Sequence, residues 1–154
     1  MNQKADNPML KAAIFDMVGL LIDSEHLWRQ GEKSTFTGLR LGLASSSPPE
    51  LIETITGKLG IGNYFSVMRS AVEEGRGKPD PAVYLSAADK LAVNPANCVA
   101  FEDSVPGVRS AKAAGMSVIA VPAEHPINEP GFNLADIKLR SLSDFSIDNE
   151  APTY

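Results

Sequence analysis

Short apolar runs alternate with segments of helical periodicity along this chain, and this alternation constrains the possible folds more than any other feature of the sequence. Each run is bounded by turn-forming residues, as the buried strands of a parallel sheet are. The five clearest runs lie at residues 10–15, 39–44, 64–70, 97–102 and 116–122. We therefore expect an α/β fold, with an open and mostly parallel sheet of five strands, helices on both faces, and a short sixth strand at residues 136–139.

The segments between the runs carry helix start and stop signals. Ser47 and Glu50 have the spacing of a capping box, and Gly60 follows the last apolar position of this first segment. A second helix is expected to begin near Asp80, and a third to span residues 104–114. The positions predicted to face the core are Leu51, Ile52, Ile55 and Leu59 in the first helix, and Tyr84, Ala87, Ala88 and Leu91 in the second.

The size and charge of the chain indicate one folded domain and exclude some kinds of partner. Residues 1–154 have the usual length of one domain, and 44% of them are apolar, so a folded core is expected. The formal net charge is −5 and there is no basic run, which argues against nucleic acid or an anionic membrane as a partner. Because no apolar run has the length of a transmembrane helix or the setting of a signal peptide, we expect a cytoplasmic protein.

Polar side chains follow the predicted strands at one edge of the sheet. Asp16 comes directly after the first run, and three serines at 45–47 come after the second. Lys78 precedes the second helix, while Glu102 and Asp103 stand at the end of the fourth run. Ligands of such sheets bind beyond the carboxyl ends of the strands, so these side chains are expected to converge on one site.

The converging groups together support phosphoryl chemistry. Mg²⁺ binds one or two carboxylates and retains waters and a phosphate oxygen. Ser45 stands where a helix N-terminus can hold phosphate, and Lys78 can balance charge on the phosphate and on a carboxylate. Asp16 can then attack phosphorus and form an aspartyl-phosphate. Taken singly, each of these residues also fits an ordinary role as a turn residue, a helix cap or a solvated charge.

Four segments carry a family resemblance, in the order FDMVGLLIDSE, LGLASSSP, GKPDPAVYL and VAFEDSVPGVRSAKAAGM. They resemble the four motifs of the haloacid dehalogenase superfamily, and they are most similar to its sugar-phosphatase and β-phosphoglucomutase-like branch. The resemblance covers residues 10–122. It implies a single Rossmann-like core domain over residues 1–154 that uses Mg²⁺ as its cofactor.

The resemblance also implies a role for each motif residue. Asp16 resembles the nucleophile, and Lys78 resembles the lysine that balances its charge. Ser45 and the amide of Ser46 resemble the phosphate clamp. The implied metal-binding residues are Asp16, Val18 through its backbone carbonyl, Asp103, and Glu102 either as a ligand or in support of the ligands.

Two departures from the family pattern bear on activity. The family's phosphatases carry a second aspartate, two residues after the nucleophile, as general acid and base, and Val18 occupies that position here. A positioned acid–base group is worth about 10²–10⁴ in rate. Relatives also insert a helical cap that excludes water and selects the sugar, whereas here the insertion expected between about 28 and 39 is absent. Residues 23–33 leave room for one helix of about three turns.

The sequence therefore predicts a Mg²⁺-dependent phosphatase of small phosphorylated sugars that acts through an aspartyl-phosphate and is impaired by Val18 and by the missing cap. The alternative is a catalytically inactive module that binds Mg²⁺ and phosphate, or a partner protein. A further variant is a capless phosphatase that acts on a bulky phosphorylated partner, because an open site admits large substrates. Apolar surface exposed by the loss of the cap would favour self-association.

Overall fold

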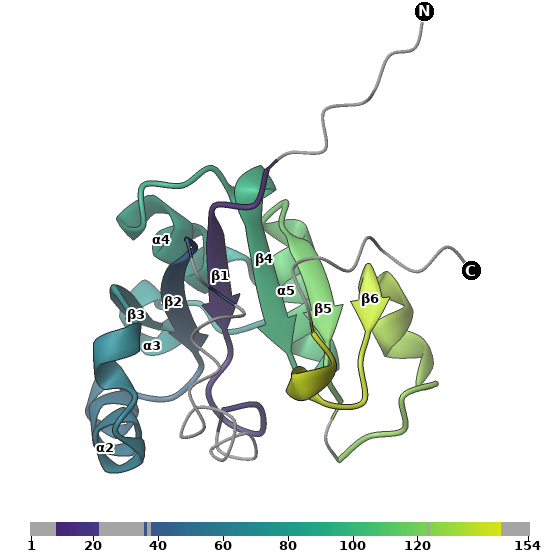
Figure 1. Ribbon diagram of the computed structural model, residues 1–154, viewed down its shortest axis with the longest axis horizontal. Coiled ribbons are helices and arrows are strands. Elements are labelled where there is room, and N and C mark those ends of the chain that lie inside the picture. The colour runs from purple at the N-terminus through teal and green to yellow at the C-terminus, as the bar shows by residue number, and fades with distance from the viewer. Residues whose placement is uncertain (1–8, 22–35, 37, 123, 146–154) are drawn as a thin grey trace, which may run out of the picture.

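The central element is a six-stranded sheet in the order β3-β2-β1-β4-β5-β6, in which all neighbouring strands are parallel (Figure 1). The computed structural model describes residues 9–21, 36, 38–122 and 124–145. The strands are β1 (Ala12–Phe15), β2 (Arg40–Ser45), β3 (Val67–Ser70), β4 (Cys98–Glu102), β5 (Ser117–Ala120) and β6 (Ile137–Lys138). The predicted parallel sheet is therefore confirmed, including its short sixth strand.

From β2 onward, helical segments connect the successive strands. They are α2 (Pro49–Leu59), α3 (Ala71–Glu74), α4 (Ala82–Lys90) and α5 (Val105–Ala113), with 3-10 segments η2 (Gly62–Tyr64), η3 (Pro95–Asn97), η4 (Pro130–Leu134) and η5 (Leu142–Asp144). The three predicted helices correspond to α2, α4 and α5, whereas the short α3 was not predicted. The helix expected at residues 23–33 lies outside the described residues. None of the helices in the described part of the chain combines the length and the apolar character needed to cross a membrane.

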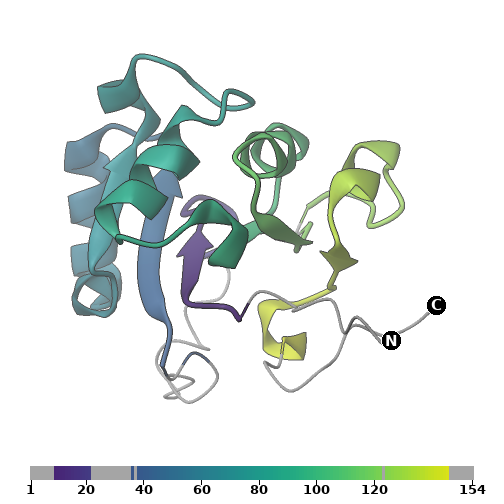
Figure 2. The ribbon, with the colours of Figure 1, turned by 90° about the horizontal axis from the view of Figure 1, so that it is seen from above.

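The side chains of each central strand alternate between two cores. In β1, Ala12 and Ile14 join the cluster that includes residues of α4 and α5, whereas Ala13 and Phe15 join the opposite cluster with Ile52 of α2. Figure 2 shows α4 and α5 on the same side of the sheet and η5 on the other. Because both faces are covered, central strands such as β1 and β4 are nearly continuous apolar runs rather than alternating ones.

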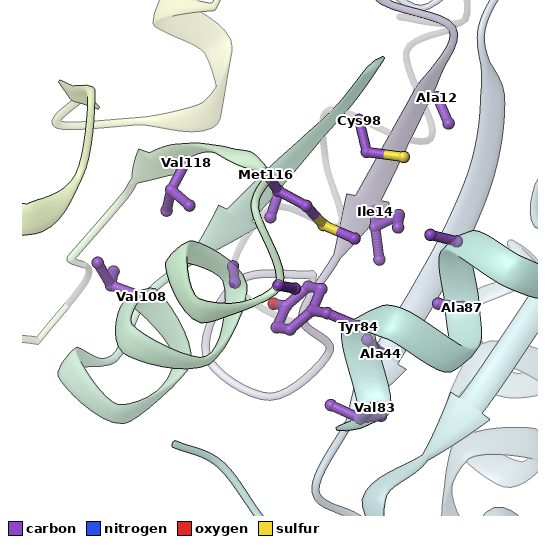
Figure 3. Packing of buried hydrophobic residues seen from close by; sticks show 14 of the residues in the cluster. Ala12, Ile14, Ala44, Val83, Tyr84, Ala87, Cys98, Val108, Met116 and Val118 are labelled. Atoms are coloured by element: carbon purple, nitrogen blue, oxygen red, sulfur yellow. The ribbon is translucent and has the colours of Figure 1, made fainter. Parts of the chain in front are cut away.

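The predicted apolar stripe of α4 is confirmed. Its four members, which are Tyr84, Ala87, Ala88 and Leu91, are all buried. Figure 3 shows the ring of Tyr84 between α4 and α5, in a cluster that also contains Ile14 and Met116. The start of α5 also matches its prediction, since the side chain of Ser104 accepts a hydrogen bond from the Gly107 N–H.

The start of α2 differs from its prediction. Pro48 is the N-cap residue and makes no side-chain cap hydrogen bond, so the capping box of Ser47 and Glu50 is wrong. The N–H of Ser47 instead donates to Ser45 Oγ at 3.1 Å, and its carbonyl accepts from Ser70 Oγ at 2.7 Å. Ser47 thus connects the end of β2 to the end of β3 through its backbone and does not cap the helix.

The buried face of α2 also differs in part from the predicted one. Leu51 is exposed, whereas Ile52 and Thr56 are buried. The Thr56 hydroxyl donates to the Ile52 carbonyl at 2.8 Å, so its polar group is satisfied within the helix. Ile55 and Leu59 pack against the core beside Ile52, as predicted. Thr56 is therefore an additional buried position, and Leu51 is the one predicted member that lies outside the core.

The strand order places the edge of the sheet where ligands bind. From β1 the chain moves outward to β2 and β3, and then returns so that β4 lies on the other side of β1. The connections thus leave in opposite directions at β1 and β4, which makes this position a topological switch point. Phe15 of β1 is in register with Phe101 of β4, so Asp16 and Glu102 follow at the same level of this edge.

Candidate active site

Asp16 is held at the carboxyl end of β1 by the sheet itself. Its N–H donates to the Phe101 carbonyl at 3.1 Å, which extends the β1–β4 ladder one residue past the strand. The residue is 8% exposed. The backbone of the predicted nucleophile is therefore fixed by two central strands while its carboxylate meets the edge of the sheet.

Lys78 reaches this carboxylate from the loop before α4. Its Nζ donates to Asp16 Oδ1 at 2.8 Å, to Glu102 Oε1 at 2.5 Å and to the Ala44 carbonyl at 3.1 Å. The side chain is 6% exposed. An ammonium group has three N–H donors, and each of them has an acceptor here. The structure thus brings the predicted lysine and aspartate into direct contact.

Glu102 is the most enclosed charged group of the site, with no exposed surface. Its Oε1 accepts from both Lys78 and the hydroxyl of Tyr84, and its Oε2 accepts from Ser104 Oγ at 3.4 Å. A Cβ at Gly107 would overlap this carboxylate, so a glycine there allows α5 to approach it. Both oxygens of Glu102 therefore already accept hydrogen bonds within the protein.

Two residues of this network have contacts that were not predicted. The pattern placed Tyr84 in the apolar stripe of α4 and Ser104 at the start of α5, and both assignments are correct but incomplete. The available signal was chemical, because a buried tyrosine hydroxyl needs a hydrogen-bond partner. Tyr84 is the one hydroxyl-bearing member of the predicted stripe, and its partner is Glu102.

A cavity of about 250 Å³ opens in front of these groups. It is lined by Asp16, Val18, Ser45, Ser46, Ser47, Lys78, Asp103 and Ser104. Ser45 is buried, whereas Ser46 is exposed at the mouth of the cavity. Of the residues predicted for the site, only Glu102 is absent from the lining, because it lies behind Lys78.

Two carboxylates, those of Asp16 and Asp103, line this cavity, and the Glu102 carboxylate lies close behind them. Oxygen atoms of Asp16, Glu102 and Asp103 all lie within 4.8 Å of one another. Gly19 has a φ of +82°, and a Cβ there would overlap the Asp103 carboxylate, so a glycine serves both the turn and the close approach. The donor set is of the oxygen type that Mg²⁺ prefers.

The charges of the site act strongly on one another. Burial raises the pKa of Asp16 to about 6, against the opposing effect of Lys78, and Asp103 adds to the rise. Burial also raises the pKa of Asp103. Burial alone would lower the pKa of Lys78, but the Glu102 and Asp16 carboxylates raise it above its ordinary value. A divalent cation beside Asp16 and Asp103 would relieve their repulsion, so the residues present fit a bound Mg²⁺.

Val18 lines the same cavity and is 50% exposed. Its side chain has no group that can give or take a proton. The described lining contains no histidine, and its carboxyl groups are those of Asp16 and Asp103. The position two residues after the predicted nucleophile is therefore apolar, as the sequence indicates.

The parallel sheet, with a carboxylate and lysine pair at its switch point, defines an α/β protein whose ligand site lies beyond the carboxyl ends of the strands. More specifically, the chain belongs to the haloacid dehalogenase-like hydrolase family, whose model matches residues 34–115. Hexitol phosphatase B of Escherichia coli strain K12 is 45% identical over 109 residues, which are 71% of this chain and 49% of that protein.

Two further relatives agree with this family. β-Phosphoglucomutase of Bacillus subtilis is 34% identical over 71% of this chain and 46% of its own length. The crystal structure of CbbY from Rhodobacter sphaeroides in complex with phosphate is similar, with a TM-score of 0.63 and 27% identity over 82% of this chain and 54% of that one. The chain spans about half the length of the curated relatives it matches.

The raised pKa of Asp16 predicts how Mg²⁺ and pH act on stability. An unfolded aspartate has a pKa of about 3.9, so between there and about 6 only the folded state keeps this proton. Without metal, the contribution of Asp16 to stability therefore falls as pH rises through this window, by an amount on the order of 3 kcal/mol. Mg²⁺ binds the ionised form, so we expect the Mg²⁺-induced rise in Tm to be larger at pH 7.5 than at pH 5.

Thermal unfolding with and without Mg²⁺ at the two pH values measures this effect. Asp16→Asn should remove most of the difference between the Mg²⁺-induced rises in Tm at the two pH values. The matched control is Glu53→Gln, which neutralises an exposed carboxylate on α2 and should leave the difference intact. An equal Mg²⁺ effect at both pH values would contradict the assignment of Asp16 to the metal.

Proposed function

We propose that this chain is a Mg²⁺-dependent phosphatase-type hydrolase of small phosphorylated sugars that acts through an aspartyl-phosphate on Asp16. The observation that carries the proposal is one cavity lined by Asp16, Ser45, Lys78 and Asp103 at the switch point of the sheet. The names of the relatives support the substrate class, since they include a hexitol phosphatase and a β-phosphoglucomutase. The relative solved with phosphate supports the type of ligand.

The residues divide the chemistry among them. The Asp16 carboxylate forms a bond to phosphorus as the bond from phosphorus to the sugar oxygen breaks, and water later attacks phosphorus and releases Asp16. Lys78 balances charge on Asp16 through its 2.8 Å bond and on the phosphate as it approaches. Ser45, through its hydroxyl, and Ser46, through its N–H, hold phosphate oxygens. In this assignment the hydrogen bonds of Glu102 suit support of Lys78 rather than metal binding.

The metal site is assigned to Asp16, Asp103 and the backbone carbonyl of Val18. Bound Mg²⁺ would supply charge neutralisation and orient the phosphate toward Asp16. The close approach of the Asp16 and Asp103 carboxylates supports this assignment. The tight packing of Gly19 against Asp103 supports it as well, because it limits where the Asp103 carboxylate can lie.

Both chemical steps need a proton transfer that Val18 cannot make. The sugar oxygen leaves as an alkoxide unless a proton reaches it, and the attacking water must lose one. We therefore propose that turnover is weak, and that the single core domain over residues 1–154 has no cap insertion between about 28 and 39 to close the site. Residues 24–38 provide the whole connection between the first two motifs.

A single-turnover experiment tests this proposal. With Mg²⁺ and an aryl phosphate whose leaving group needs little acid help, we expect a burst of phenolate approaching one equivalent, followed by slow turnover. Asp16→Asn should abolish the burst, and rapid acid quenching followed by mass spectrometry should detect phosphate on Asp16. If neither the burst nor the phospho-enzyme is detected, the proposal that this chain acts through an aspartyl-phosphate is wrong.

One observation favours a second candidate, a catalytically inactive module that binds Mg²⁺ and phosphate. Val18 places an apolar side chain on the wall of the cavity. Such a module should bind Mg²⁺ and trifluoroberyllate, as the enzyme would, and yet form no phospho-enzyme from any phosphate ester. The two candidates therefore differ in covalent chemistry and not in ligand binding.

A further inference from the structure

We propose that Tyr84 is a positioning residue of the phosphate site, whose hydroxyl holds Glu102 so that Lys78 remains shared between Glu102 and Asp16. This inference rests on the proposed function, because it assigns Lys78 to phosphate. Tyr84 does not line the cavity, so its role is exerted through Glu102 and Lys78 alone. It is therefore distinct from the residues that contact phosphate.

The first support is the geometry of a single oxygen atom. Glu102 Oε1 accepts a hydrogen bond from the Tyr84 hydroxyl at 2.5 Å and another from Lys78 Nζ at 2.5 Å. Glu102 and Tyr84 have no exposed surface, so water does not take the place of either donor. Lys78 Nζ in turn contacts Asp16 Oδ1 at 2.8 Å. Three side chains thus connect the core directly to the predicted nucleophile.

The position of Lys78 depends on a balance between two carboxylates. In a buried environment a charge-assisted hydrogen bond is strong. Each carboxylate has its own N–H donor, but both attract the same ammonium group toward themselves. The Tyr84 hydroxyl reduces the demand of Glu102 on Lys78, because it satisfies the same oxygen. Without the hydroxyl, Nζ should move toward Glu102 and away from Asp16 and the cavity. Less positive charge would then face a bound phosphate.

The packing of Tyr84 does not explain its hydroxyl. The ring lies between α4 and α5 in the apolar cluster with Ile14 and Met116, where a phenylalanine would fill nearly the same volume (Figure 3). Lys78 Nζ also lies 5.1 Å from the centre of the ring, a contact that a phenylalanine would keep. The hydroxyl is therefore the one part of Tyr84 that acts specifically on the charged network.

The test is Tyr84→Phe in the full chain. With saturating Mg²⁺, we expect inorganic phosphate and trifluoroberyllate to bind about tenfold more weakly, as measured by calorimetry and ¹⁹F NMR. The affinity for Mg²⁺ alone should change less than about twofold, because Asp16 and Asp103 are untouched. The matched control is Thr56→Val, which removes another buried hydroxyl, in α2, and should leave phosphate affinity unchanged.

A second variant tests the direction of the effect. Glu102→Gln in the Tyr84→Phe background keeps an acceptor for Lys78 but removes the competing charge, so phosphate affinity should recover toward that of the unaltered chain. If Tyr84→Phe and the unaltered chain bind phosphate equally well, the role proposed for Tyr84 is wrong, but the proposed function is not affected. Absence of phosphate binding in the unaltered chain would overturn the proposed function and this inference with it.

Discussion

Replacing Val18 by aspartate is expected to raise steady-state hydrolysis of sugar phosphates by about 10²–10⁴. The new carboxyl group would stand on the wall of the cavity that Asp16 and Lys78 also line. It would protonate the leaving sugar oxygen and then take a proton from the attacking water. Steady-state release of inorganic phosphate from a hexitol phosphate measures the effect, with the aryl phosphate burst as an internal count of competent sites.

The control for this substitution is Val18→Asn, which has nearly the same shape as the aspartate and no titratable proton. Because Val18 is half exposed, both variants should keep stability within about 0.5 kcal/mol of the unaltered chain. Equal rates for the asparagine and aspartate variants would show that general acid–base catalysis is not what the site lacks. The short connection at residues 24–38 would then be the remaining cause of weak turnover.

The sheet could be predicted because its strands are buried on both faces. Such strands appear in the sequence as short continuous apolar runs, and alternation with helices then implies parallel pairing. The boundaries and faces of helices were harder to predict, since they depend on local polar contacts. Thr56 occupies a core position because its hydroxyl is satisfied by a backbone carbonyl, and no apolar pattern reveals that. The N-cap at Pro48 instead of Ser47 has a similar origin, because Ser47 is engaged in ties to β2 and β3.

The candidate site could be predicted as a set of residues, but its internal connections could not. Asp16 and Asp103 each come directly after a strand, so strand order alone brings them to one edge. Lys78 comes from a loop, and its three acceptors depend on the path of that loop. Whether Glu102 faces the cavity or the core depends on Tyr84 and Gly107, which belong to different helices.

Removing the charge of Lys78 with Lys78→Met is expected to destabilise the protein by about 3–5 kcal/mol at pH 8. The Glu102 and Asp16 carboxylates would lose their common cation while remaining buried. Chemical denaturation measures this loss, and Mg²⁺-free buffer keeps metal binding out of the comparison. The matched control is Lys112→Met, which breaks a partly exposed ion pair with Asp136 and should cost less than about 1 kcal/mol.

The pH dependence of the Lys78→Met variant separates lost charge from lost packing. Burial already raises the pKa of Glu102 above its ordinary value, and removal of Lys78 should raise it further. When the pKa of a carboxyl group is higher in the folded state, its contribution to the stability of the protein falls as pH rises above the unfolded pKa, which is about 4.3 for glutamate. The destabilisation by Lys78→Met should therefore be clearly smaller at pH 5, where Glu102 and Asp16 can take up protons, than at pH 8.

Glu102→Gln in the Lys78→Met background should recover stability on the order of 1–3 kcal/mol at pH 8. A cost that is the same at both pH values would assign the loss to altered packing at position 78 instead of to the buried carboxylates.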